Sequence, residues 1–327
     1  MKFALCSVLL VGASLVSHAS FEMMILVDNT NKQFLRYDPL TNATLGSFGR
    51  GQWGYWGNTP GIALDTASPG SIASLDISGF VHKIDYSTGE SRGTLALAGA
   101  TTGGSSFFSP LLKVLGNGNY LVQSNLSTAP MIFDRNTGAV VTSMSTYAGF
   151  TTLDVAPMND GTYVTLERSG SGTYSFYLFR RNAAGGFLNS TTIASSTVFN
   201  RYHQISIAGN SAYLAGFDGT FPRVGSFSIG ASSFTENTVF HSVTGGNPGT
   251  NIMLGHGSNA YFLQTDTTNG ARLYDFNTVG GSVVPRLNTS MTQDLGPKGV
   301  IIVAPEPASL LALGLGGLAL VRRRRSK

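Results

Sequence analysis

The stretch Ile84-Asp85-Tyr86-Ser87-Thr88-Gly89 returns further along the chain as Phe133-Asp134-Arg135-Asn136-Thr137-Gly138. The aspartate of such a stretch can accept hydrogen bonds from the backbone that follows it, and the glycine allows the positive φ of a hairpin turn. Four weaker copies extend the series, whose second residues stand at positions 38, 85, 134, 180, 228 and 275. The intervals of 47, 49, 46, 48 and 47 residues indicate one domain built from an internal repeat.

Short apolar runs precede these turns and predict β-strands. The runs closest to a turn are 119–123, 162–166, 212–215 and 260–263, and those further upstream are 61–64, 111–114, 152–155, 204–207 and 252–254. Apolar and aromatic residues bounded by Gly, Asn and Asp are typical of strands. Four strands in every ~47 residues, without a competing helical pattern, predict an all-β fold, a six-bladed β-propeller.

Residues 1–19 have the form of a signal peptide for Sec-type export. Lys2 gives a positive start, residues 3–16 are apolar, and Ser17-His18-Ala19 ends the segment in the pattern of a cleavage site. We predict cleavage after Ala19. The only cysteine, Cys6, lies within this segment, so the mature chain has no thiol for disulfide, zinc or nucleophilic chemistry.

Removal of residues 1–19 leaves the first unit of the domain, which we place at residues 20–304, one strand short. The apolar run 298–303 is left over at the other end of the domain. Pairing this run with residues 23–27 would close the ring and remove two exposed sheet edges. We therefore predict that the last strand completes the first blade.

The chain ends in Pro305-Glu306-Pro307, an uncharged apolar segment at 308–321 and a basic tail at 322–327 that starts with Arg322, Arg323, Arg324 and Arg325. A helix over 308–321 would be about 21 Å long, against a hydrocarbon core of ~30 Å. Arginine side chains extend such a span by reaching the headgroups. We predict a transmembrane helix in the inner membrane, with the arginines in the cytoplasm and the rest of the chain outside.

The order of parts in residues 305–327 resembles the bacterial PEP-CTERM sorting signal. The resemblance implies recognition by an exosortase, a membrane protease-transpeptidase that cuts near the Pro-Glu-Pro triplet. It also implies delivery of the product to the cell surface or to the extracellular exopolysaccharide matrix. The resemblance covers about 23 of 327 residues and implies nothing about the body of the protein. The alternative is an ordinary C-terminal anchor that carries the triplet by chance.

The formal charge of +4 comes from the two ends of the chain. Six of the 21 basic residues and one of the 17 acidic residues lie in the two terminal segments, which leaves 15 basic and 16 acidic residues in the domain. A nearly neutral domain offers no basic patch for nucleic acid. We interpret the isolated pair Arg180-Arg181 as part of a solvated turn rather than a phosphate site.

Propellers bind ligands near the ends of their innermost strands, where this sequence offers Asp65, Asp154, His203 and His256. Six-bladed hydrolases that resemble this shape hold a calcium ion there, and such a hard cation needs oxygen ligands from several strands. The predicted inner strands at 110–115 and 300–303 have no carboxylate. We interpret the aspartates as caps of turns and the histidines as local hydrogen-bonding groups, with a metal site at Asp65 and Asp154 as the weaker alternative.

The segment Gly49-Arg50-Gly51-Gln52-Trp53-Gly54-Tyr55-Trp56-Gly57-Asn58 joins the first two units. Its aromatic rings, Trp53, Tyr55 and Trp56, can stack on the C–H faces of sugars, and its polar side chains, Arg50, Gln52 and Asn58, can hydrogen bond to them. A glycan-binding loop would match an exopolysaccharide destination. The alternative is that the rings pack between neighbouring blades, where aromatic side chains bury much area.

No residue is assigned a catalytic role, because the sequence has neither a Gly-x-Ser-x-Gly elbow nor a phosphate-binding loop. The turns resemble those of quinoprotein-like propellers, but the tryptophans that mark each blade of that type are missing, so no quinone cofactor is implied. The sequence favours an exported, non-catalytic propeller that binds exopolysaccharide or acts as a surface scaffold. The alternative is an exported propeller hydrolase, lactonase-like or glycan-active, with calcium in the central channel.

Overall fold

The chain was analysed as a computed structural model. The residues that the structure describes are 23–28, 33–38, 43–49, 61–76, 78–100, 111–123, 129–144, 149–198, 202–217, 222–230, 233–236, 241–242, 251–256, 259–266, 270–276, 283–289 and 300–303. Regular structure in these residues consists of β-strands, in agreement with the all-β prediction. None of the described segments is a helix that would reach across a lipid bilayer.

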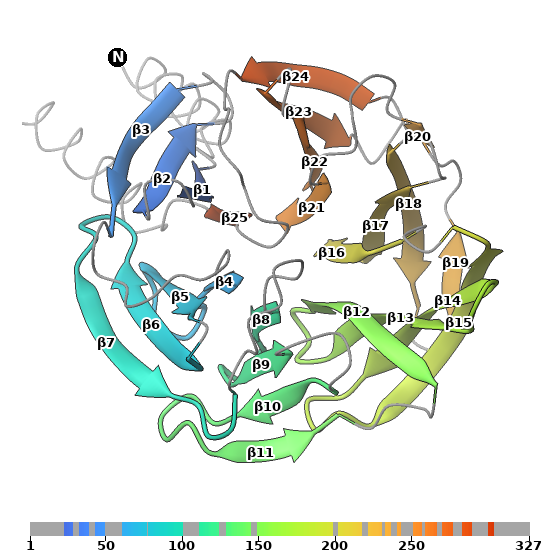
Figure 1. The fold of residues 1–327 in the computed structure, drawn as a ribbon, viewed down its shortest axis with the longest axis horizontal. Helices are drawn as coiled ribbons and strands as arrows, with labels where there is room; N and C mark the ends of the chain where they lie inside the picture. Colours follow the sequence, from blue (N-terminus) through green and yellow to red (C-terminus); the bar gives the residue numbers. More distant parts are fainter. Residues whose placement is uncertain are drawn as a thin grey trace, which may run out of the picture.

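The strands form six antiparallel sheets arranged around a common centre (Figure 1). Five sheets are each built from strands that are consecutive in the sequence. Sheet 2 contains β4 (Gly61–Leu64), β5 (Ser71–Leu75), β6 (Phe80–Asp85) and β7 (Ser91–Ala96). Sheet 3 contains β8 (Leu111–Val114), β9 (Tyr120–Gln123), β10 (Met131–Phe133) and β11 (Val140–Ser143). Sheet 4 contains β12 (Phe150–Pro157), β13 (Tyr163–Ser169), β14 (Tyr174–Arg181) and β15 (Phe187–Ser196).

The remaining sheets follow the same up-and-down order. Sheet 5 contains β16 (Gln204–Ala208), β17 (Ser211–Phe217), β18 (Pro222–Ile229), β19 (Phe234–Glu236) and the short β20 (His241–Ser242), which also pairs with β18. Sheet 6 contains β21 (Asn251–His256), β22 (Asn259–Asp266), β23 (Gly270–Phe276) and β24 (Val283–Thr289). Sheet 1 combines both ends of the domain and contains β25 (Val300–Val303), β1 (Met23–Asp28), β2 (Gln33–Asp38) and β3 (Ala43–Phe48).

The innermost strands form a closed ring. They contact one another in the cyclic order β25, β4, β8, β12, β16, β21 and back to β25. The described residues also contain six buried hydrophobic clusters, one between each pair of neighbouring sheets. Each sheet therefore buries both faces against its neighbours, and the arrangement is a β-propeller.

The ring is closed by the strand that the sequence predicts. β25 pairs antiparallel with β1, with Met23 opposite Val303 and Leu26 opposite Val300. The side chains of Ile302 and Val303 are 8% and 2% exposed, because they lie against sheets 6 and 2 respectively. The pairing supplies the innermost strand that sheet 1 would otherwise lack.

The repeated turn joins the third and fourth strands of a sheet. In sheet 2, Gly89 N donates to Asp85 O at 2.8 Å, and in sheet 3 Gly138 N donates to Asp134 O at 2.9 Å. Both glycines have positive φ, at 81° and 70°, as the sequence predicts. At Gly138 an added Cβ would lie 2.0 Å from Ala96 O of β7, so close packing against sheet 2 also excludes a side chain there.

The sequence alignment of the fourth and fifth turns was wrong by two residues. The fourth turn begins at Asn182 rather than Arg180, because Asn182 Oδ1 accepts hydrogen bonds from Ala184 N and Gly186 N, both at 3.0 Å. The fifth turn begins at Gly230 rather than Ser228, with Gly230 N donating to Ser233 O at 2.8 Å. An asparagine and a glycine replace the aspartate of the motif, and this obscured the register.

Candidate functional site

Asp65 lies directly after the innermost strand β4, and its side chain is buried. Its Oδ1 accepts a hydrogen bond from Ala67 N at 3.3 Å, so it caps the turn that leads to β5, as predicted. Its Oδ2 lies 3.5 Å from Arg135 Nη2, which comes from the neighbouring sheet 3 and also donates to Ser68 Oγ at 2.9 Å. The carboxylate is thereby paired with a cation of the chain.

Asp154 does not cap a turn, contrary to our interpretation. It lies within β12, next to a β-bulge at Leu153, and its side chain is buried. Asp154 Oδ2 accepts a hydrogen bond from Ile205 N of β16 at 3.0 Å, and Oδ1 lies 3.8 Å from Lys113 Nζ of β8. One carboxylate thus links three successive inner strands across two sheet boundaries.

The two aspartates do not fit a calcium site. Each carboxylate faces a cationic side chain, so a divalent ion would have to displace Arg135 or Lys113. Within the part of the chain that the structure describes, no three His, Cys, Asp or Glu residues gather as a metal would need. His203 lies just before β16, and its ring stacks on Phe217 with centroids 5.7 Å apart. His256 ends β21, and its side chain lies outside the described part.

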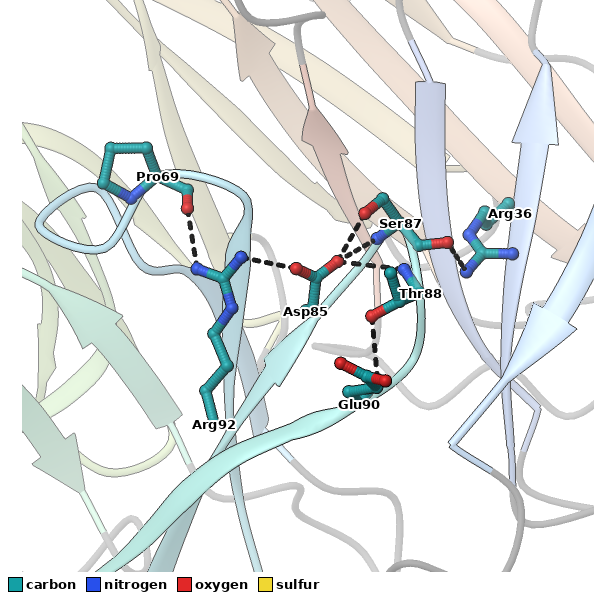
Figure 2. A network of polar contacts seen from close by, with 7 residues as sticks. All are labelled: Arg36, Pro69, Asp85, Ser87, Thr88, Glu90 and Arg92. Atoms are coloured by element: carbon teal, nitrogen blue, oxygen red, sulfur yellow. Dashed lines mark hydrogen bonds and ion pairs between the residues drawn. The ribbon is translucent and has the colours of Figure 1, made fainter.

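The hairpin turn of sheet 2 is the centre of a polar network (Figure 2). Asp85 Oδ1 accepts hydrogen bonds from Ser87 N at 2.8 Å, Thr88 N at 2.9 Å and Ser87 Oγ at 2.5 Å, and Asp85 Oδ2 pairs with Arg92. Partial burial raises the pKa of the Asp85 carboxyl, but these hydrogen bonds outweigh it and hold the pKa well below its usual range. Asp85 therefore stays ionised and keeps the turn in shape.

A cationic side chain from the preceding sheet reaches each of three such turns. Arg36 of β2 donates from Nε to Tyr86 O at 2.6 Å. It also donates from Nη2 to Ser87 O at 2.7 Å (Figure 2). Lys83 Nζ of β6 donates to Arg135 O at 3.3 Å, and Arg180 Nη1 of β14 donates to Gly230 O at 3.0 Å. Each donor lies two residues before the turn of its own sheet. The repeat therefore places a hydrogen-bonding cationic side chain between neighbouring sheets.

Arg181 is buried in sheet 4, and our interpretation of the Arg180-Arg181 pair as a solvated turn was wrong. Its Nη2 lies 2.5 Å from Glu167 Oε1, and both side chains are 0% exposed. Nη1 donates to Gly185 O at 3.1 Å, and the guanidinium lies over the Phe187 ring, 3.9 Å from its centroid. Glu167 Oε1 also accepts a hydrogen bond from Thr165 Oγ1 at 2.8 Å. This buried ion pair was missed because adjacent basic residues usually indicate surface.

Several predicted sites lie outside the described residues. They are the cleavage site at Ala19, the aromatic segment with Arg50, Gln52, Trp53, Tyr55, Trp56 and Asn58, and the C-terminal residues Pro305, Glu306, Pro307, Arg322, Arg323, Arg324 and Arg325. The described strands fix only where these segments join the propeller. The aromatic segment joins β3 to the beginning of β4, and the C-terminal segment follows the end of β25.

Residues 303–325 match the family model of the PEP-CTERM protein-sorting motif. The chain carries a PEP-CTERM sorting motif. The motif implies export, membrane-anchored sorting toward the cell surface and processing by an exosortase. The match begins at Val303, the last residue of β25, so the sorting motif follows the closing strand without a linker.

Comparison with known proteins supports the propeller fold alone. In sequence, the chain matches no curated protein. Its fold is similar to that of the β-propeller domain of Cps50 (Swd1) from Myceliophteria thermophila, with a TM-score of 0.52 and 12% identity over 81% of this chain and 82% of that one. It is also similar to a candidate 6-phosphogluconolactonase from Bacteroides fragilis, with a TM-score of 0.52 and 11% identity over 88% of this chain and 99% of that one.

Proposed function

We propose that this protein is a non-catalytic β-propeller that an exosortase retains at the cell surface or in the exopolysaccharide matrix, where it binds polysaccharide or acts as a scaffold. The observation that carries the proposal is the junction between fold and motif. The sorting motif begins at the last residue of the strand that closes the ring. Cleavage near the Pro-Glu-Pro triplet would leave residues 300–303 in the body. Processing would therefore release a propeller that remains closed.

The contacts of the two candidate acids favour a binding role over catalysis. The candidate acids near the channel, Asp65 and Asp154, already hold neighbouring sheets together through Arg135, Ile205 and Lys113. A carboxylate engaged in this way is poorly suited to act as a base or a metal ligand. We therefore expect purified protein to contain no stoichiometric calcium by elemental analysis. One calcium ion per chain would favour the hydrolase alternative.

Sorting is tested by expressing the full chain and a chain that ends at Ala304 in a bacterium with an exosortase. We expect the full chain to accumulate at the surface or in the matrix, in a form shorter than the precursor. The truncated chain should be released into the medium. The same distribution for both chains, with the full chain uncut, would contradict the proposed sorting.

Glycan binding is tested with a variant of the aromatic segment, Trp53→Ala combined with Trp56→Ala. We expect this variant to lose retention on purified exopolysaccharide while its thermal unfolding is unchanged. The matched control is Phe80→Ala on β6, an aromatic side chain that is 40% exposed elsewhere on the propeller. Equal retention of the double variant and the control would remove the polysaccharide from the proposal and leave the scaffold role.

A further inference from the structure

The chain leaves the propeller at a defined place. Val303 ends the innermost strand β25, opposite Met23 at the start of β1. Arg36, Arg135 and Arg180 each reach a turn at the corresponding end of a neighbouring sheet, and Gly116 lies next to Gly161 of the next sheet. We infer from these contacts that the inner strands all run in the same direction along the axis of the ring. Val303 therefore lies near the centre of the ring, on the face formed by the ends of the inner strands. We call this the exit face. Its described turns after the innermost strands are residues 65–70, 115–119, 158–162 and 209–210, and its described turns after the third strands are residues 86–90, 134–139 and 182–186, together with Gly230.

The tether between Val303 and the predicted membrane helix at 308–321 is short. Five residue steps separate Val303 from Ala308, which at full extension span at most about 17 Å. Crossing the headgroup region on one side of a bilayer takes roughly 6 Å of that length. The exit face therefore lies within about 11 Å of the headgroups.

This length prevents the propeller from turning over. Four strands at ~4.8 Å spacing place the outermost strand roughly 14 Å further from the centre than the innermost one. If the outermost strands of one sheet contacted the membrane instead, Val303 would lie above the headgroups by the sum of two lengths. These are the roughly 14 Å between outermost and innermost strands and the radius of the ring of inner strands. The tether is too short for this arrangement. An inverted ring would hold Val303 on the side away from the membrane and would require a still longer tether.

Arginine side chains compensate most of the carboxylates of the exit face. Its described turns consist mainly of Gly, Asn, Ser and Thr, and the acidic residues in or directly beside them are Asp65, Asp85, Glu90, Asp134 and Asp160. Asp65 pairs with Arg135, Asp85 with Arg92 and Asp160 with Arg180. Three of the five carboxylates thus have a cationic partner, which limits the repulsion from anionic headgroups.

We propose that the exit face of the membrane-anchored protein contacts the phospholipid headgroups, and that the opposite face points away from the membrane. The inference rests on the anchoring assumed in the proposed function. It gives the propeller one orientation before processing, in which the inner strands begin on the side away from the membrane. β4, which follows the aromatic segment, begins on that outward face.

The orientation is tested with one fluorescent probe on each face. The two positions belong to the turns at either end of β5 and are both exposed: Thr66 on the exit face and Ser78 on the opposite face. Thr66→Cys and Ser78→Cys are introduced separately into the full chain with Cys6→Ser, which leaves a single thiol for labelling. The labelled chains are reconstituted into phospholipid vesicles that carry a short-range quencher on the headgroups, and vesicle binding is measured by flotation.

We expect both chains to float with the vesicles, and only the probe at Thr66→Cys to lose fluorescence. Equal quenching at the two positions, or stronger quenching at Ser78→Cys, would overturn the orientation while leaving the anchoring intact. Chains that do not float would overturn the anchoring and the orientation with it. The same variants without residues 305–327 are the control, and neither should be quenched.

Discussion

The buried ion pair of Arg181 and Glu167 gives the sharpest prediction about stability. Both side chains are fully buried in sheet 4, and their charges are 2.5 Å apart. Glu167→Gln keeps the size of the side chain but removes its charge, which leaves Arg181 buried without compensation. Removal of one partner of a buried pair costs about 3–5 kcal/mol. That is a large share of the roughly 5–15 kcal/mol by which a folded domain is stable.

The control is a second arginine–carboxylate pair of the same sheet. Arg180 Nη2 lies 2.5 Å from Asp160 Oδ2, but the Asp160 side chain is 47% exposed. Asp160→Asn should cost under about 1 kcal/mol, because solvent screens the pair. The combined replacement of Glu167→Leu and Arg181→Met should recover most of the stability that Glu167→Gln loses, since hydrophobic residues of similar volume replace a buried pair at little cost.

The assay is urea unfolding of the domain, followed by circular dichroism, with the free energy of unfolding extrapolated to water. We expect the order wild type, Asp160→Asn and the Glu167→Leu and Arg181→Met double variant, followed at a distance by Glu167→Gln. A Glu167→Gln chain no less stable than Asp160→Asn would refute the assignment of Arg181 to the interior.

Two further predictions concern the repeated turns. Gly138→Ala should destabilise the domain more than Gly99→Ala. Both glycines have positive φ, which alone costs a substituted residue roughly 1–2 kcal/mol, but only the Cβ at 138 would meet a backbone atom, Ala96 O at 2.0 Å. Thermal unfolding of the two variants measures the difference. The hydrogen bonds that lower the pKa of Asp85 stabilise the folded chain at pH values above ~3.9, the pKa of an aspartate in the unfolded chain. This stabilisation is lost as the pH falls from ~3.9 toward the lower pKa of Asp85 in the folded chain. Melting temperatures between pH 6 and pH 2 should therefore fall less steeply for Asp85→Asn than for wild type, and parallel curves would contradict the role of this carboxylate.

The repeat in the sequence predicts most of the fold. The turns at Asp85 and Asp134 can be predicted from their own residues, because an aspartate with a glycine four residues later favours a hairpin turn. The unpaired run at 298–303 predicts the closure, since a ring with one missing strand leaves two sheet edges exposed. At Asn182 and Gly230 the same turn is made with other residues, so the spacing of the repeat alone misplaced it by two positions.

The partners of the buried charged side chains could not be predicted from the sequence. Asp154 was interpreted as a cap because aspartates are common in turns, whereas in the structure it joins β12 to β8 and β16. Arg181 was interpreted as exposed, although the alternation of Tyr163, Thr165 and Glu167 along β13 places them on one face, where Arg181 reaches Thr165 and Glu167. Such partners are about 14 or more residues apart in sequence, or in another sheet, and a residue type does not reveal them.

The closing strand tests the account most directly. The measurement is the melting temperature of residues 20–304 compared with the same chain lacking residues 298–303. Loss of the buried side chains of Ile302 and Val303, worth about 1.5–3 kcal/mol each, would also expose Met24 and Leu26 of β1, which are 1% exposed in the closed ring. We predict that the shortened chain melts at a much lower temperature or without a cooperative transition. An unchanged melting temperature would show that β25 does not close the ring.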